Sequence, residues 1–167
     1  MEGNKKNKPR GILVFGAPCS GKTTFAEKFA AKYGLAYYNI DELTHEYDLN
    51  RQAVLLLIEL VLRTRQTIII EGGLDSENER TEIRNILRNN GYNPALIWVQ
   101  TDVATIRMRL KKRYRSVSKA KQYYDDAISV IEAPTDFERP IILSGKHTFE
   151  TQNRHAVAGL ADLVETK

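Results

Sequence analysis

Residues 16–24 read GAPCSGKTT and combine glycine, lysine and hydroxyl side chains at a spacing that suits a phosphate chain. Gly16 is followed after four residues by Gly21, Lys22 and Thr23, which is the P-loop pattern. In such a turn, glycines let backbone N–H groups approach phosphate oxygens. Lys22 supplies a mobile charge for the outer phosphates, and the hydroxyl of Thr23 suits Mg²⁺. The segment therefore predicts a cradle for a triphosphate.

The elements around this segment support that interpretation. GILVF (11–15) is a short apolar run typical of a buried strand, and residues 23–34 carry apolar side chains at helical spacing before Gly34. The start of a helix also adds its positive dipole end to the cradle. We therefore expect every residue of the turn to contribute to nucleotide binding: Gly16, Ala17, Pro18, Cys19, Ser20, Gly21, Lys22, Thr23 and Thr24.

The rest of the chain alternates between strand-like and helix-like segments. Strands are predicted at 11–15, 35–40, 66–71, 94–100 and 139–144. Helices are predicted at about 21–33, 51–65, 77–90, 103–114, 119–132 and 150–164. This alternation indicates an α/β fold with a parallel sheet covered on both faces, whose ligands bind beyond the carboxyl ends of the strands.

Carboxylates follow three of these strands, and each has two interpretations. Asp102 precedes a helix and is expected to be its N-cap. Asp41 could cap the segment 42–47, but we favour a role beside the phosphates, where it would take a hydroxyl proton or hold Mg²⁺ through water. Glu71 ends an apolar strand as a metal-binding acidic residue would, and both a metal-binding role and a purely structural role stay open.

Basic residues are concentrated in IRMRLKKRYR (106–115). Arg109 and Arg113 lie one helical turn apart and could clamp a phosphoryl group in transfer, which we favour over a solvated cationic face. A second series, Arg80, Arg84 and Arg88, also recurs at helical spacing. For that series we expect a solvated face, with nucleic-acid binding as the less favoured alternative.

Bulk properties restrict the class of protein. The chain has 167 residues, 42% of them hydrophobic, which fits a single domain over 11–167 preceded by a flexible basic tail at 1–10. A single cysteine excludes an intramolecular disulfide, and the longest apolar run is too short to span a bilayer. We expect a cytoplasmic protein without a membrane segment, and the sequence does not indicate an oligomeric state.

Four segments together resemble the small P-loop kinases: GAPCSGKTT, YYNIDEL, IIIEGG, and RLKKR followed by FERPIIL. The resemblance includes kinases of the nucleoside-monophosphate and shikimate type. It is closer to the short AAA domain kinases, which are related to polynucleotide 5′-hydroxyl kinases and zeta-type toxins. It implies a three-layer α/β/α P-loop NTPase fold, strand order 2-3-1-4-5, a helical lid around 107–135, and ATP with Mg²⁺.

The same resemblance implies roles for single residues. Lys22, Asp41, Arg109 and Arg113 would be catalytic, with the two arginines in the RxxxR pattern of the lid. Metal ligation is implied for Thr23, Asp41 and Glu71, and contact with adenine for the loop that contains Ser144, Gly145 and Lys146. Two departures from the pattern are that NID lacks the paired aspartates of several sugar and shikimate kinases, and that IIIEGG has Glu in place of Asp.

Three functions are compatible with these observations. The first is transfer of the γ-phosphoryl group of ATP to a hydroxyl or phosphate of a small metabolite, nucleoside or nucleotide. The second is the same transfer to a nucleic-acid 5′-hydroxyl, and the third is a nucleotide-binding switch or ATPase without an acceptor. The chain has no NKxD, LSGGQ-like or apolar-run-Asp-Glu motif, which argues against GTPases, transporter ATPases and AAA+ motors.

Overall fold

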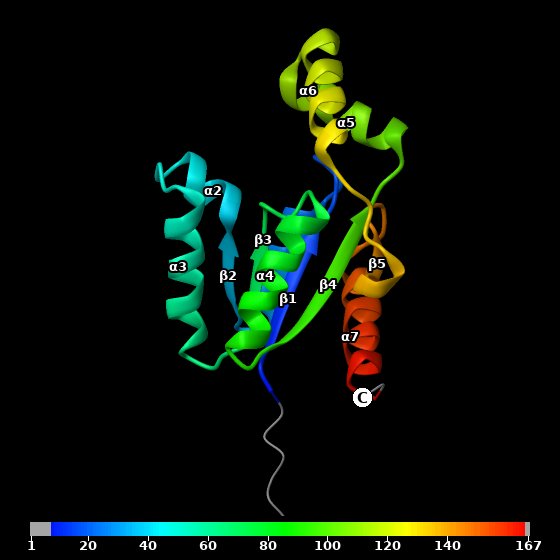
Figure 1. Ribbon diagram of the computed structural model, residues 1–167. Helices are drawn as coiled ribbons and strands as arrows, with labels where there is room; N and C mark the ends of the chain where they lie inside the picture. Colours follow the sequence, from blue (N-terminus) through cyan, green and yellow to red (C-terminus); the bar gives the residue numbers. More distant parts are fainter. Residues whose placement is uncertain (1–7, 166–167) are drawn as a thin grey trace, which may run out of the picture.

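Five short strands form one parallel sheet at the centre of the computed structural model, which describes residues 8–165. The strands are β1 (Arg10–Phe15), β2 (Ala36–Asn39), β3 (Ile68–Glu71), β4 (Asn93–Gln100) and β5 (Ile141–Ser144). Their order is β2-β3-β1-β4-β5, and every neighbouring pair is parallel (Figure 1). The predicted fold class and strand order are confirmed.

Helices cover both faces of this sheet. The helices α1 (Lys22–Tyr33) and α7 (Phe149–Glu165) pack on one face, where Phe25 and Phe29 meet Ile12 and Val14 of β1. On the other face, α3 (Arg51–Leu62) and α4 (Glu77–Asn89) pack against the side chains that point the opposite way from β1 and β3. Alternate residues of β1 thus enter two separate cores, as expected for a strand buried on both faces.

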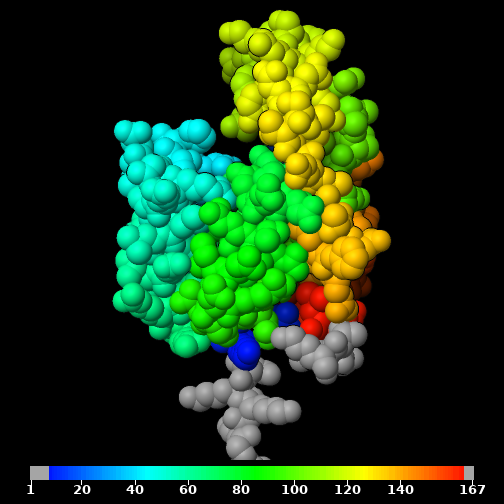
Figure 2. Space-filling model, viewed as in Figure 1, coloured from blue at the N-terminus to red at the C-terminus, as the bar shows by residue number. Residues whose placement is uncertain are grey.

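Two further helices project beyond the carboxyl ends of the strands as a hairpin (Figures 1 and 2). They are α5 (Val103–Tyr114) and α6 (Val117–Val130), joined at Arg115, which has the left-handed φ of 52°. Ile106, Leu110, Ala120 and Tyr124 form a small core inside the hairpin, and Ala17 and Cys19 pack against it. The α5–α6 hairpin therefore rests on the predicted phosphate cradle.

The ends of several elements differ from the sequence prediction. A short helix, α2 (Ile40–His45), follows β2 directly, because the Asn39 side chain accepts the N–H groups of Asp41 and Glu42 and so caps it. The helix α6 begins at Val117, two residues early, since Ser116 caps it. A 3₁₀ turn, η1 (Asp136–Glu138), precedes β5.

The predicted N-terminal tail falls partly outside the described residues, which exclude 1–7 and 166–167. Arg10, the last residue of that predicted tail, belongs to β1 instead. Its guanidinium donates to the carbonyl of Leu160 at 2.6 Å, and its N–H donates to Thr67 at 3.1 Å. Over residues 8–165, no helix combines the length and apolarity that crossing a bilayer would need.

The expectation of a solvated face was wrong for Arg80. This side chain is fully buried and forms hydrogen bonds through Nε and Nη2 to the carboxylate of Glu138, at 2.7 and 3.1 Å. Its Nη1 donates to the carbonyls of Leu74, Asp75 and Glu132. Arg80 shares the i, i+3, i+7 spacing of the buried α4 residues, so it belongs to the apolar face, and Glu138 compensates its charge.

Candidate active site

The P-loop has the backbone geometry that its sequence predicts. Gly21 adopts a φ of +101° immediately before α1, and a Cβ on Gly16 would collide with the carbonyl of Val99. Cys19 also adopts a left-handed φ, of 58°, and the N–H of Ser20 donates to the carbonyl of Ala17 at 3.0 Å. The turn therefore wraps tightly around the start of α1, and the first N–H groups of such a helix are the usual donors to a bound anion.

Glu71, at the end of β3, is buried behind the P-loop. Its Oε1 accepts a hydrogen bond from the Thr23 hydroxyl at 2.5 Å and lies 4.0 Å from Nζ of Lys22. Its Oε2 accepts the Tyr37 hydroxyl at 2.8 Å, and the pKa of Tyr37 is raised by burial and then by the hydrogen bond and charge of Glu71. Glu71 is therefore held in one orientation, directed at the hydroxyl that is predicted to bind Mg²⁺.

These oxygen groups fit a magnesium ion of the kind that accompanies a bound triphosphate. No group of three or more His, Cys, Asp or Glu within residues 8–165 could hold a metal by itself. Mg²⁺ commonly takes only one or two protein ligands and completes its shell with phosphate oxygens and water. The Thr23 hydroxyl, backed by Glu71, matches that limited protein contribution.

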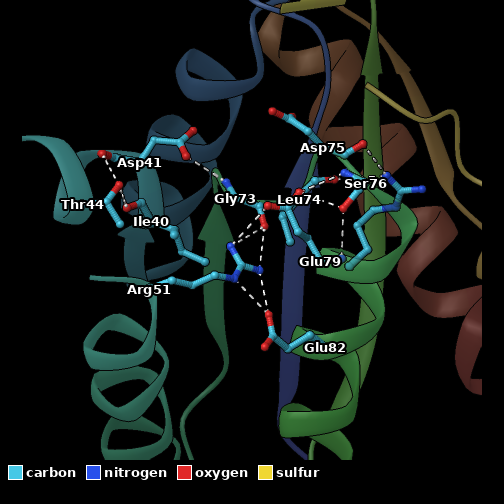
Figure 3. A network of polar contacts seen from close by, with 11 residues as sticks. Ile40, Asp41, Thr44, Arg51, Gly73, Leu74, Asp75, Ser76, Glu79 and Glu82 are labelled. Carbon is cyan, nitrogen blue, oxygen red and sulfur yellow. Dashed lines mark hydrogen bonds and ion pairs between the residues drawn. The ribbon is translucent and has the colours of Figure 1, made fainter. Parts of the chain in front are cut away.

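Asp41 lies on α2 and faces the loop after β3. Its Oδ1 accepts the N–H of Gly73 at 3.0 Å, and a Cβ on Gly72 would come within 2.7 Å of the same carboxylate. The interpretation of Asp41 as a helix cap was wrong, because Asn39 is the N-cap of α2. The carboxylate is thus positioned by the β3–α4 loop, on the side where the strands end (Figure 3).

Asp75, in the same loop, was not identified from the sequence. Burial raises the pKa of its carboxyl group, and the negative charges of Asp41 and Glu79 raise it further, against an opposing effect of the positive charges of Lys22 and Arg80. Figure 3 shows Asp75 extending from the loop at the level of Asp41, away from Arg51 below. It lies four residues beyond β3 in an irregular segment, so no pattern in the sequence marks it.

Arg109 and Arg113, both in α5, have different surroundings. Arg109 donates through Nη1 to the carbonyls of Cys19 and Ser20, at 2.9 and 3.3 Å, and through Nη2 to the carbonyl of Gly145 at 3.0 Å. It thus ties the P-loop to the loop after β5. Arg113 is exposed and forms no ion pair with a described residue, so its guanidinium is available to a ligand.

A cavity of about 690 Å³ connects these groups. The P-loop and α1 line its floor, the α5–α6 hairpin and Ile131 line one side, and Asp41 and Asp75 line another. The loop after β5 and the start of α7 close the remaining side with Gly145, His147, Thr148, Phe149 and Gln152. The volume falls in the range of sites for small molecules and cofactors.

Comparison with known proteins agrees with this arrangement. The sequence profile of a family described as AAA domain matches residues 12–134. The chain belongs to this AAA domain family. No curated protein sequence matches it.

Solved structures show that the AAA domain protein has the fold of P-loop kinases. A gluconokinase from Sinorhizobium meliloti 1021 is similar over 95% of each chain, with 19% identity and a TM-score of 0.73. The Mycobacterium tuberculosis APS kinase CysC, in complex with AMPPNP and APS, has 14% identity and a TM-score of 0.69, over 92% of this chain and 98% of that one. Chaetomium thermophilum Kti12, in complex with ADP-AlF3, has 17% identity and a TM-score of 0.67 over the same shares.

This cavity is lined by most of the residues that the sequence predicts for the site: Gly16, Pro18, Cys19, Gly21, Lys22, Thr23, Thr24, Asp41, Arg109, Arg113 and Gly145. Five others do not line it: Ala17, Ser20, Glu71, Ser144 and Lys146. Sequence reasoning did not assign Lys28, Asp75, Tyr123, Ala127, Ile131, Phe149 and Gln152 to the site, although they line the cavity.

Lys146 has a structural partner outside this cavity. Its Nζ lies 3.2 Å from Oδ2 of Asp102, on an exposed surface. Asp102 is the N-cap of α5, as predicted, because it accepts the N–H of Thr105 at 2.9 Å. Hydrogen bonds from the backbone and side chain of Thr105, and then from Lys146, lower the pKa of Asp102 to about 2.

Proposed function

We propose that this protein is a kinase that transfers the γ-phosphoryl group of ATP to a hydroxyl or phosphate of a small metabolite, nucleoside or nucleotide. The observation that carries the proposal is that the P-loop and the carboxylate of Asp41 line the same cavity. Binding of ATP at the P-loop does not by itself require a carboxylate beside the phosphates, since a negative charge there repels them. Such a group is useful where an acceptor must be positioned and deprotonated.

In the proposed reaction, an acceptor oxygen attacks the γ-phosphorus in line with the bond to the β–γ bridging oxygen. The new O–P bond forms as the bridging bond breaks, and the electron pair of the broken bond stays on ADP. A hydroxyl acceptor loses its proton to the carboxylate of Asp41. Lys22 and the P-loop N–H groups stabilise the negative charge on the phosphate oxygens.

Bound Mg²⁺ would neutralise phosphate charge at this site. Thr23 would hold it directly, while Glu71, behind Thr23, and Asp41 would act through ordered water. The orientation of Glu71 toward the Thr23 hydroxyl supports this assignment. Thr23 has a second function in this arrangement, since its hydroxyl binds Oε1 of Glu71, the oxygen that lies 4.0 Å from Nζ of Lys22.

We expect the α5–α6 hairpin to act as a lid. Arg113 has no carboxylate partner among the described residues and lines the cavity, so it can meet charge that develops on the transferring group. Arg109 has three backbone carbonyl partners, so its contribution is to hold the P-loop and the loop after β5 at a fixed separation for the nucleotide. Closure of such a lid excludes water from the transfer.

A polynucleotide 5′-hydroxyl is the second candidate acceptor, and the charge of the hairpin is the observation that favours it. Residues 103–130 contain eight Lys or Arg and two Asp. Of these basic residues only Arg109 and Arg113 line the cavity, so the others could contact a phosphate backbone outside it. We place this candidate second because basic surfaces occur on many proteins that do not bind nucleic acid.

Transfer from γ-labelled ATP to sugars, polyols, nucleosides, nucleotides and 5′-hydroxyl oligonucleotides tests the proposal. Wild-type protein should label at least one class, and Lys22→Ala should abolish labelling. Lys32→Ala is the matched control, because Lys32 is exposed on the same helix and does not line the cavity. Tight nucleotide binding without labelling of any class would support a nucleotide-binding switch and contradict the kinase.

A further inference from the structure

The cavity has two chemically different ends. One end is lined by the loop after β5, the start of α7 and Lys28 of α1. The residues there are Lys28, His147, Thr148 and Phe149, and Nζ of Lys28 lies 5.9 Å from the centre of the Phe149 ring. At the other end lie Asp41 of α2 and Asp75 of the β3–α4 loop (Figure 3). We call this second end, lined by Asp41, Asp75, Ala127 and Ile131, the acceptor compartment.

The lid contributes the apolar part of the acceptor compartment. The N–H of Glu132 donates to the carbonyl of Asp75 at 2.8 Å, which places the neighbouring Ile131 beside the loop. Ala127 lies one turn earlier in α6, and both side chains line the cavity. A molecule in this compartment therefore has carboxylates on one side and hydrocarbon on the other.

Two arginines beside the β3–α4 loop, Arg51 and Arg80, are already paired. Arg51 donates to the carbonyl of Gly73 and pairs with Glu82 at 2.9 Å and Glu79 at 3.4 Å. Figure 3 shows its guanidinium on the opposite side of the loop from Asp75. Arg80 is fully buried and bound to Glu138. Neither arginine lines the cavity, so neither is placed to form an ion pair with an anionic group of an acceptor.

The carboxylates of the acceptor compartment, in contrast, have no cationic partner at or below 4.0 Å among the described residues. Asp41 accepts one backbone N–H, and no hydrogen bond to the side chain of Asp75 is found within residues 8–165. Of the cations that line the cavity, Lys22 and Arg113 are the ones proposed to meet the phosphates of ATP, Arg109 is bound to backbone carbonyls, and Lys28 lies at the other end beside Phe149. Anionic groups in the compartment would thus meet two carboxylates that no ion pair neutralises.

We propose that the acceptor is a hydroxyl compound without an anionic group, either uncharged or carrying an amine, and that Asp75 selects for it. The inference rests on the proposed kinase function. Asp75 accepts a hydroxyl or ammonium hydrogen of the acceptor, and Asp41 takes the proton of the hydroxyl that attacks the γ-phosphorus. Asp75 is a specificity residue, whose charge rejects carboxylate and phosphate groups.

Matched acceptors that differ only in charge test this selection. D-Glucitol, D-glucamine and D-gluconate share a six-carbon chain, and glucose, glucosamine and glucuronate form a second series. A nucleoside and its 5′-monophosphate form a third. In any series whose members accept phosphate from ATP, we expect kcat/KM for the anionic compound to be about 10- to 100-fold lower than for the neutral compound or the amine. This is the effect expected for like charges a few ångströms apart at a protein surface.

Variants of Asp75 test whether this residue causes the preference for acceptors without an anionic group. Asp75→Asn should narrow the ratio between neutral and anionic acceptors by at least about tenfold, and Asp75→Lys should reverse it. Glu77→Gln is the matched control, since Glu77 is exposed on the same segment and does not line the cavity. Melting temperature and ATP affinity show whether a variant is folded, and the nearly isosteric Asp75→Asn keeps the test valid if Asp75→Lys does not fold.

The outcomes separate this inference from the proposed function. Preferential transfer to the anion by the wild type, or a ratio that Asp75→Asn leaves unchanged, overturns the inference while the kinase function stands. Absence of transfer to every compound in all three series, with ATP bound, contradicts both. Preference for the neutral or amine compound that is lost in Asp75→Asn supports both.

Discussion

The variant Asp41→Asn distinguishes a catalytic role of this carboxylate from a structural one. The amide oxygen of asparagine can still accept the N–H of Gly73, now at 3.0 Å from Oδ1, so the loop after β3 should keep its position. Asp41 is exposed, and exchanging a charged acceptor for a neutral one there costs about 1 kcal/mol or less. For a chain of this size, that corresponds to about 2–4 °C in Tm.

Catalysis should respond far more strongly than stability. An amide cannot take the acceptor proton, so the transfer rate should fall by about 10²- to 10⁴-fold, the usual contribution of general base catalysis. ATP affinity should change only slightly, because the P-loop N–H groups and Lys22 are untouched. The predicted pattern is a large loss of kcat at nearly constant ATP Kd and Tm.

Three measurements on two variants check this pattern. We would measure kcat for the acceptor found in the labelling screen, ATP Kd by calorimetry, and Tm. Asp48→Asn is the matched control, since Asp48 is exposed outside the cavity and has a left-handed φ of 52°, which asparagine tolerates well. A kcat for Asp41→Asn within about threefold of the control would remove Asp41 from the mechanism, since general base catalysis contributes far more than that.

Three other predictions follow from the site and its supports. Arg113→Ala should lower kcat by roughly 10- to 1,000-fold with a small change in ATP Kd, whereas Arg109→Ala should mainly weaken ATP binding; equal effects of both variants in steady-state kinetics would contradict this division. Glu138→Gln leaves Arg80 buried without a charge partner and should cost about 3–5 kcal/mol in urea unfolding at pH 7. Burial raises the pKa of Glu138, but hydrogen bonds and the charges of neighbouring arginines lower it overall below 4.5, so the cost should shrink as the pH falls below that value and Glu138 itself becomes protonated. Cys19 lines the cavity, so bound Mg-ATP should slow its alkylation in a mass-spectrometric assay, and equal rates with and without nucleotide would place the thiol outside the site.

The sequence predicts best those features that arise from contiguous residues. The P-loop is such a feature, because its glycines, lysine and threonine act within one turn of chain. Alternation of strands and helices is another, since apolar spacing within each segment determines which element forms. The position of Glu71 beside Thr23 followed from the same logic, because parallel strands end at one edge of the sheet.

Features that depend on distant partners were not predictable in this way. Arg80 reads as one more basic residue of an amphipathic helix, and only Glu138, 58 residues away, makes its burial favourable. Arg109 has the spacing of a lid arginine, yet three carbonyls from two separate loops determine where its guanidinium lies. In both cases the local spacing identifies the residue as part of a basic helix face, but a contact with residues distant in the sequence determines its role.

The difference between shared fold and specific chemistry lies in the loop after β3. Similarity to a gluconokinase and to an APS kinase at 19% and 14% identity shows the fold, which does not identify an acceptor. On the proposed assignment, the acceptor contacts Asp41 of α2 and Asp75 of the β3–α4 loop, while the two arginines beside this loop, Arg51 and Arg80, pair with glutamates. If Asp75 selects the acceptor as we propose, a change of its charge should alter what this compartment binds without disturbing the nucleotide end, so acceptor preference can diverge within one fold.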